Sequence, residues 1–513
     1  MSEHPEPELA ERAAERHVVV VGGGVAGLVA ARECAKIGMR VTLLEATAEL
    51  GGAVRRAEID GVRLDAGAES FATRGGHVRR LVNELGLADH VQTPAAGGAW
   101  LAGVPGVEPL PLPKGGILGI PANPFVDDVR RIIGWRGAWR AYVDRVRPPL
   151  TIGHERSLGR LVAARMGRRV LERLVAPVVS GVYSAHPDDV DVDVAAPGLN
   201  AALTRVGSLS GAVDALVGQQ QAARKDKAPG SAVEGLADGM STLVDALRAD
   251  LDKLGAVVRT GAAVESLTRA GDAWTVAVAA VDEADPEAPE APEAPEAPEA
   301  PDAAEAASPA DDEPLTADAV IIATAEGPAR ALLDGHVADL GAAAASPEIE
   351  IVTLLLDAPA LDAAPRGTGV LTVPGSFTAK ALTHATAKWT WLRETAGSRH
   401  VVRVSFGSQG EPAATASLDD DAAAQLALEQ ASALLGIPLS SAQLVGAHRA
   451  RFTQSQPASL IGAGERRRRT RTAVEAVPGL AVVGAWLSGT GLAQVVPDAT
   501  AEADRIRRHL LWA

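Results

Sequence analysis

Near the N-terminus, the alternation of apolar runs and polar breaks predicts a strand, a helix and a second strand. His17–Val21 is a short β-branched run, typical of a buried parallel strand. Residues Leu28–Ile37 follow a helical pattern that Gly38 ends. Arg40–Glu45 is again strand-like. This order predicts the opening βαβ unit of an α/β fold.

Further elements follow along the chain, separated by Gly, Pro or charged residues. In chain order we expect a helix over Gly235–Leu251, strands within Ala256–Val281, strands over Ile349–Leu356 and Val401–Phe406, a helix over Asp419–Leu435, a buried strand over Leu480–Gly484 and a last helix over about Ala499–Leu511.

One segment cannot belong to a core. Residues 286–301 repeat Pro-Glu-Ala, with proline at every third position, which favours extended polyproline II structure. The repeat separates the strand-like runs Trp274–Val281 and Ala317–Thr324. An enlarged hairpin loop is therefore favoured over a docking tail.

Composition narrows the class of protein. The 513 residues carry a net charge of −16, of which 13 acidic residues lie between Asp282 and Glu313, so the remainder has a net charge near −3. A basic nucleic-acid surface is not expected. Cys34 is the one cysteine, which rules out an intramolecular disulfide, and the histidines lack metal-ligand spacing. With neither a membrane-spanning run nor a secretory signal, we expect a cytoplasmic protein with at most peripheral membrane contact.

The first glycine-rich turn carries the most specific chemical pattern. Gly22, Gly24 and Gly27 lie between the first strand and the helix, and Glu45 ends the next strand. In this pattern the glycines allow a tight turn, a close approach of backbone to pyrophosphate, and close packing of helix on strand. Free N–H groups at the helix N-terminus bind phosphate, and a carboxylate accepts hydrogen bonds from ribose hydroxyls. The sequence therefore predicts a dinucleotide site.

Two later segments favour FAD over NAD. Gly51 and Gly52 follow the acidic residue and precede Arg55, which suits a cofactor that continues beyond its pyrophosphate. Asp65–Ser70 offers another stretch of small residues for close approach. A flavin has to reach from the dinucleotide site towards a second domain.

Gly22–Arg55 resembles the amine oxidase and protoporphyrinogen oxidase flavoproteins. Further segments narrow the resemblance to the FAD-dependent porphyrinogen oxidases, and the soluble Gram-positive type is most similar. These segments are Gly67–Arg74 with Leu81–Leu87, Ala176–Tyr183 with Pro187–Asp189, Ala387–Trp389, and Gly484–Leu492. The resemblance covers nearly the whole chain, apart from the first 16 residues and the repeat.

The resemblance implies FAD as cofactor and assigns roles by position. The pyrophosphate would be held by Gly22, Gly23, Gly24, Val25, Ala26 and Gly27, the ribose by Glu45 and Ala46, and the adenine by Val264. The flavin side would be lined by Gly52, Ala53, Gly67, Ala68, Glu69, Ser70, Trp389, Gly484, Thr490, Gly491 and Leu492.

It also implies the reaction. The expected activity is oxidation of coproporphyrinogen III to coproporphyrin III in haem synthesis, with oxygen as acceptor, six electrons removed and hydrogen peroxide formed. Protoporphyrinogen IX is the alternative substrate. The cofactor would carry the hard chemistry, so no catalytic base is assigned. A ferrochelatase is a candidate recipient of the product, and the oligomeric state stays open.

A flat tetrapyrrole bearing carboxylates needs an apolar slot and basic residues at its rim. By position in the family pattern, the candidates are Phe71, Arg74, Val182 and Tyr183. A peripheral aromatic–basic face around Trp135 and Trp139 is also conceivable, but core packing is favoured for both.

Two other functions remain open. An amine oxidase or carotenoid desaturase would share the fold. Amine oxidases usually carry a lysine on a strand that aligns with Ser346–Leu356, and this window has none. A flavin-binding partner protein without turnover is the second alternative.

The expected architecture is a discontinuous FAD-binding Rossmann-like domain with an interwoven α+β substrate domain. Its segments are a disordered tail (1–16), FAD-binding parts (17–74, 231–335 and 451–513), a helical substrate or membrane-type domain (75–230), a substrate-domain sheet (336–450) and a disordered acidic insert (282–314).

Overall fold

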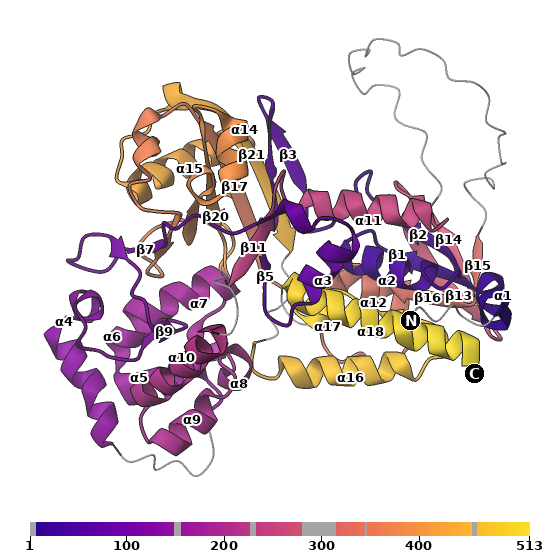
Figure 1. The fold of residues 1–513 in the computed structure, drawn as a ribbon, viewed down its shortest axis with the longest axis horizontal. Coiled ribbons are helices and arrows are strands. Elements are labelled where there is room, and N and C mark those ends of the chain that lie inside the picture. The colour runs from indigo at the N-terminus through magenta and orange to yellow at the C-terminus, as the bar shows by residue number, and fades with distance from the viewer. Residues whose placement is uncertain are drawn as a thin grey trace.

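The computed structural model describes residues 7–147, 155–225, 232–279, 314–343, 346–453 and 459–512. Figure 1 shows three regions: a layered α/β half on the right, a sheet with α14 and α15 at the upper left, and a group of helices at the lower left. The acidic insert predicted for 282–314 lies outside the described residues, except for its last position.

The α/β half is built on a five-stranded parallel sheet. Valine and isoleucine dominate its central strands, which are buried on both faces, as parallel sheets require. Pairing is regular, with Val19 beside Val320 and Thr42. The strand order is β12 (Val257–Arg259), β2 (Arg40–Leu44), β1 (His17–Val21), β16 (Ala319–Ile322) and β22 (Leu480–Val482).

Alternate side chains of these strands enter two separate cores. One core packs against α2 (Val25–Ala35), α3 (His77–Glu84), α11 (Ser241–Lys253) and α18 (Leu492–Trp512). The other packs against β13 (Val264–Ala270), β14 (Ala273–Val278), β15 (Leu315–Ala317), α12 (Glu326–Leu333), α16 (Ala463–Glu475) and α17 (Ala485–Ser488). The result is a three-layer domain assembled from distant parts of the chain.

The strands on either side of the acidic insert pair with each other. Trp274 of β14 lies opposite Ala317 of β15, in an antiparallel arrangement. The expected hairpin is therefore confirmed. β14 and β15 lie at the side of the molecule seen on the right in Figure 1.

The second large sheet has seven strands. Its order is β21 (Leu444–Thr453), β17 (Glu348–Leu356), β20 (His400–Phe406), β19 (Ala381–His384), β18 (Gly369–Thr372), β7 (Ala99–Ala102) and β8 (Leu110–Pro111). The helix α15 (Asp420–Leu435) covers one face. The short helices α13 (Ala385–Lys388) and α14 (Thr390–Ala396) follow β19.

A cluster of helices packs beside this sheet around its own apolar core. Its helices are α4 (Asp127–Tyr142), α5 (Leu158–Met166), α6 (Arg168–Val170), α7 (Ala176–Tyr183), α8 (Val192–Ala195), α9 (Leu199–Val206) and α10 (Leu209–Lys225), with a π-helical stretch, Leu171–Val175, between α6 and α7. In the described part of the chain, no helix has the length and apolarity needed to cross a membrane.

Short strands complete the fold. β3 (Arg56–Ile59) and β4 (Val62–Asp65) form a hairpin, and β5 (Phe71–Ala72), β11 (Val233–Leu236) and β6 (Val91–Gln92) form a three-stranded sheet at the junction of the regions. β9 (Gly116–Ile117) and β10 (Ile120–Pro121) pair with each other.

The N-terminal segment differs from the prediction. Residues Pro7–Glu15 form the helix α1, where a disordered tail was expected. Ala13 is fully buried in the core around α2 and α18, and Arg16 pairs with Asp318 at 3.0 Å. One small apolar contact and an ion pair order a segment whose composition alone indicates disorder.

The segment 75–230 is less uniformly helical than predicted. α3 packs into the core of the FAD-type domain. β7 joins the seven-stranded sheet, where Trp100 lies opposite Val370 of β18 in a parallel pairing. The last helix also begins earlier than predicted, at Leu492, and continues through Pro497 because Val495 and Val496 pack into the core.

The prediction of core packing for Trp135 and Trp139 was wrong. Both lie on α4 with more than half of their surface exposed. They flank Phe125, whose ring centroid is 5.2 Å from that of Trp139, and the Arg130 guanidinium lies over the ring of Trp135. α4 therefore presents an aromatic–arginine face to solvent.

Candidate flavin-binding and active site

The glycine-rich turn has the shape that a pyrophosphate requires. Gly22 has a φ of 110° and donates its N–H to the carbonyl of Leu44 at 2.7 Å. A Cβ on Gly27 would collide with the carbonyl oxygen of Gly22, so the helix can begin this close only with glycine. Beside Gly24, in contrast, the space is open. Gly24 caps α2 without a side-chain hydrogen bond, which leaves the first N–H groups of the helix free for an anion.

The second glycine pair closes over this turn. Gly51 donates its N–H to the carbonyl of Gly23 at 2.9 Å, and Gly52 has its Cα beside that of Gly24. Ala53 then accepts a hydrogen bond from Ala68 at 3.0 Å. A Cβ on Gly67 would meet the carbonyl of Ala53. The structure thus brings the predicted segments 22–27, 52–53 and 67–70 into one continuous surface of backbone.

The predicted ribose and adenine residues lie at one edge of this turn. Glu45 Oε2 accepts the N–H of Gly23 at 2.7 Å, and Glu45 Oε1 accepts the N–H of Thr47. Ala46 follows and is exposed. The backbone N–H of Ala262 reaches the carbonyl of Glu45 at 2.8 Å, which places Val264, at the start of β13, beside this edge.

The C-terminal turn returns to the same end of the sheet. Gly484 follows β22, has a φ of 118° and lies next to the carbonyl of Thr324. Thr490 and Gly491 are exposed, and Leu492 begins α18, which packs beside α2. Because β1 and β22 are parallel strands of one sheet, both following helices start at the same edge. The residues present therefore fit FAD along this edge.

Glu69 is the centre of a charged cluster beside the predicted flavin segment. Its oxygens pair with Lys388 Nζ at 2.5 Å and with Arg403 Nη1 at 2.8 Å. Burial favours the neutral acid, but the two cations outweigh it and lower the pKa of Glu69 to about 2. Arg403 also donates to the carbonyls of Ala66 and Gly67. A fixed carboxylate and guanidinium thus hold residues 66–69 against β20.

Trp389 packs next to the segment that contains Glu69. It is only 2% exposed, and its ring packs against Gly235 close to the carbonyl of Glu69. Lys388 Nζ lies 5.2 Å from the ring centroid. The ring belongs to the core between β4 and α14.

The candidate substrate residues separate into two groups. Phe71 is 2% exposed and packs in the core with α3, which leaves it no surface for a substrate. Arg74 and Val182 are exposed, and Tyr183 is half-buried at the end of α7. Burial raises the pKa of Tyr183, and the nearby charge of Arg74 opposes that rise. Arg74, Val182 and Tyr183 therefore gather near one end of α7.

α7 faces the seven-stranded sheet. A Cβ on Gly181 would meet the side chain of Leu371 on β18. On the α7 side of the sheet, Leu371, Ala381, Thr383 and Ser405 are half-buried, whereas Val370, Leu382 and Val404 on the other side are fully buried under α15. The partly open face runs from α7 towards Arg403 and the flavin segment.

Sequence reasoning missed Lys388 and Arg403. Arg403 and Glu69 are 334 residues apart in the chain. Strand alternation could have placed Arg403 on one face of β20, as a charged residue within an apolar run, but the pattern does not reveal which segment that face meets. For Lys388, its place beside the aromatic at 389 was an available signal.

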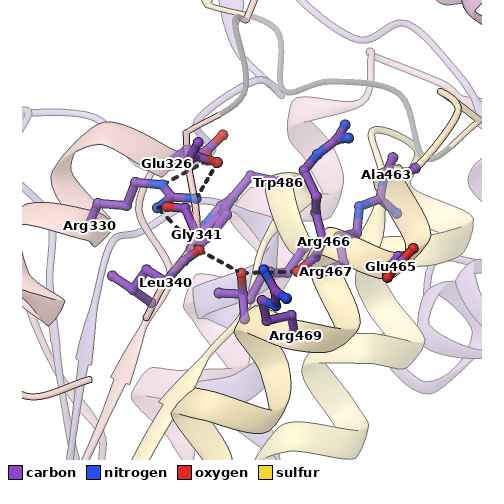
Figure 2. A pocket seen from close by; sticks show the side chains of 14 residues that line it. Glu326, Arg330, Leu340, Gly341, Ala463, Glu465, Arg466, Arg467, Arg469 and Trp486 are labelled. Carbon is purple, nitrogen blue, oxygen red and sulfur yellow. Dashed lines mark hydrogen bonds and ion pairs between the residues drawn. The ribbon is translucent and has the colours of Figure 1, made fainter. Parts of the chain in front are cut away.

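A cavity of about 320 Å³ lies elsewhere, between α12, α16 and α17. Figure 2 shows Trp486 between Arg330 and the arginines Arg466 and Arg467. Its lining includes none of the predicted cofactor residues. The arginines Arg466, Arg468 and Arg469 form an exposed basic face of α16, which ends at Glu475.

Neither metal nor thiol chemistry is indicated by the described residues. No group of three or more His, Cys, Asp or Glu in them has the arrangement of a metal site. Cys34 is fully buried in α2, and burial raises the pKa of its thiol to about 12.

Comparison with known proteins agrees with this geometry. Residues 25–507 match the family of flavin containing amine oxidoreductases. A coproporphyrinogen III oxidase from Mycobacterium bovis is 30% identical over 93% of this chain and 94% of its own length. The enzyme of the same name from Bacillus subtilis is 31% identical, but over 35% of this chain and 39% of its own length. That of Propionibacterium freudenreichii is 33% identical over about a third of each chain.

Solved structures share the fold. A putative protoporphyrinogen oxidase from Exiguobacterium superposes with a TM-score of 0.77 at 22% identity, covering 96% of this chain and 99% of the other. Putrescine oxidase bound to putrescine gives a TM-score of 0.61 at 15% identity, covering 97% and 99%. The chain uses FAD and belongs to the flavin-containing amine oxidoreductase family, within which it is an FAD-dependent porphyrinogen oxidase.

Proposed function

We propose that this protein oxidises coproporphyrinogen III to coproporphyrin III with molecular oxygen. The observation that carries the proposal is the 30% identity to the mycobacterial coproporphyrinogen III oxidase, which extends over 93% of the chain. The remaining support comes from the geometry beside the flavin segment.

The reaction removes six hydrogen atoms from the porphyrinogen. Three molecules of oxygen take them up as three molecules of hydrogen peroxide, so atoms and electrons balance. When bound, the flavin would accept two electrons in each of three rounds, and the net loss is one hydrogen from each of the four meso carbons and one from each of two pyrrole nitrogens.

The protein's own groups orient the reactants. Arg403 and Lys388 hold Glu69 as a carboxylate, and Arg403 fixes the carbonyls of residues 66 and 67. The backbone that would contact the flavin is thereby rigid before substrate binds. Glu69 has a low pKa and two cationic partners, so it is a positioning residue and not a proton acceptor.

The substrate would lie on the half-buried face between α7 and the strands β18 to β20. Leu371 and Ala381 supply apolar surface there, and Arg74 and Tyr183 lie at its margin. This combination suits a flat macrocycle with anionic substituents. Protoporphyrinogen IX is the alternative substrate, because it differs only in carrying two vinyl groups in place of two propionates. Product transfer to a ferrochelatase and a cytoplasmic location belong to the same proposal.

The test is an aerobic assay of the purified holoenzyme with each porphyrinogen separately, following porphyrin fluorescence and peroxide. We expect faster turnover with coproporphyrinogen III and three peroxides for each porphyrin. A preference for protoporphyrinogen IX would assign the alternative substrate. Absence of turnover with both, from protein that holds one FAD per chain, would refute the proposal and favour an amine oxidase or a non-catalytic flavoprotein.

A further inference from the structure

Lys380 is a half-buried cation that has no ion-pair partner among the described residues. It lies just before β19, and its Nζ donates to the hydroxyl of Ser184 at 2.6 Å. No carboxylate in the described residues pairs with it, and burial, the one resolved cause, lowers the pKa of this lysine to about 8. At neutral pH the ammonium is still mostly charged. Partial burial of a charge without an opposite charge is costly, and groups perturbed in this way cluster at functional sites.

Polar groups surround Lys380, and one of them has no hydrogen-bond partner. Ser184 caps α7 in the left-handed region, with a φ of 51°, which is unfavourable for a residue other than glycine. The carbonyl of Ser184 accepts the N–H of Gln409 at 2.8 Å. The side-chain Oε1 of Gln409 is buried and has no hydrogen-bond partner. The position of Ser184 at the C-terminal cap of α7 explains its backbone conformation. It does not explain why the charge of Lys380 lacks an ion-pair partner or why the side-chain oxygen of Gln409 lacks a hydrogen bond.

The position of Lys380 relates it to the proposed substrate face. Ser184 directly follows Val182 and Tyr183 on α7. The N–H of Lys380 bonds to the carbonyl of Ser405, two residues along β20 from Arg403, which is a distance of about 7 Å along the strand. Arg403 in turn holds the carbonyl of Gly67. The cation therefore lies at the far end of the same face from the flavin segment.

We propose that Lys380 and the hydroxyl of Ser184 form a binding subsite for a carboxylate of the substrate. The proposal rests on the proposed function, because the substrate it describes is a porphyrinogen with propionate side chains. A bound carboxylate would supply the missing counter-ion through a charge-assisted hydrogen bond from Nζ. Lys380 would then contribute to substrate binding and orientation, but not to the redox step.

The variants Lys380→Met and Lys380→Arg separate charge from packing, since methionine keeps most of the apolar stem and arginine keeps the charge. Two readouts are needed: KM and kcat for coproporphyrinogen III, and the Kd of the product coproporphyrin III from fluorescence titration. We expect K380M to raise KM and Kd about tenfold, the loss expected for a charged hydrogen bond. The values of kcat and FAD content should stay within about twofold, and K380R should restore most of the affinity.

Two further variants show whether the effect is specific to the Lys380 subsite. Lys253 is an exposed lysine at the end of α11, so Lys253→Met should leave KM and Kd unchanged. Ser184→Ala, which removes only the hydroxyl, should raise KM by a smaller factor, about threefold. Wild-type KM and Kd in K380M would overturn the inference, as would a fall in kcat at constant KM. If the wild-type holoenzyme binds coproporphyrin III through Lys380 yet shows no turnover, the proposed reaction fails and the subsite stands.

Discussion

Asp65 is a buried carboxyl group beside the flavin segment, and its ionisation destabilises the folded protein. It is 6% exposed and accepts the N–H of Met240 at 2.8 Å, near the start of α11. Burial raises its pKa to about 7, although Arg403 and the Met240 N–H oppose this. The folded protein thus binds the proton more tightly than the unfolded chain, whose aspartate titrates near 3.9. The free energy of unfolding should therefore fall as pH rises from about 4 to about 7.

Asp65→Asn tests that relation, because asparagine keeps an oxygen for the Met240 N–H and loses the charge. We expect the variant to gain stability relative to wild type at pH 8, by at most about 4 kcal/mol, and to gain little at pH 4. Urea unfolding of the holoenzyme at both pH values measures this. An equal stability difference at the two pH values would show that Asp65 does not titrate in this range.

The substitution Gly27→Ala tests the cofactor site by adding a single Cβ atom to the glycine-rich turn. Gly27→Ala would bring a methyl group against the carbonyl of Gly22, so the turn would have to open and FAD affinity should drop at least tenfold. The matched control is Gly218→Ala on α10, where the new Cβ would meet no neighbouring element among the described residues. The control should retain FAD and gain a fraction of a kcal/mol, because alanine favours helix over glycine. Flavin absorbance per chain after gel filtration measures both, and full FAD content in G27A would contradict the site.

At the scale of elements, α4 differs from an ordinary packed helix. Replacing both Trp135 and Trp139 by serine should change the free energy of unfolding by less than about 1 kcal/mol, because both rings are mostly exposed. Trp274 on β14 is the control: it is fully buried, and Trp274→Ala should cost about 3–5 kcal/mol. Thermal unfolding of the three proteins checks this, and a loss in the double α4 variant as large as that in W274A would contradict its exposure.

The elements also show what the sequence can predict. β1, α2, β2 and β22 were predictable because apolar runs of β-branched residues and their flanking glycines are local signals. The parallel pairing of β7 with β18 was not, since it joins residues near 100 to residues near 370 through tertiary packing. The candidate site likewise has one part that local sequence predicts and one part that only the fold brings together. The glycine motif is local, whereas Lys380 and Ser184 are 196 residues apart and meet only in the fold.

At the scale of the whole molecule, the FAD-binding domain and the seven-stranded sheet region meet at residues 66–69. Arg403 and Lys388 attach this segment of the FAD-binding domain to the seven-stranded sheet. α7 of the helical cluster lies against the same sheet at Gly181. The proposed substrate face is therefore composed of parts from two regions, beside a cofactor segment from the third.

The two strands that flank the acidic insert in sequence lie apart from this junction. These strands, β14 and β15, belong to the far layer of the FAD-binding domain. Deleting residues 286–301 should therefore leave kcat, KM and FAD content unchanged within about twofold, because long surface loops contribute little to stability. Steady-state assay of the shortened protein checks this. A loss of activity at unchanged FAD content would indicate that the repeat contributes to function.

The central claim is that porphyrinogen electrons enter the flavin held at this junction. The most direct measurement is anaerobic mixing of the holoenzyme with coproporphyrinogen III while flavin absorbance is followed, with putrescine as the comparison reductant. We predict rapid bleaching by coproporphyrinogen III, recovery on admitting oxygen, and no bleaching by putrescine. Bleaching by the diamine alone, or by neither compound, would contradict the account.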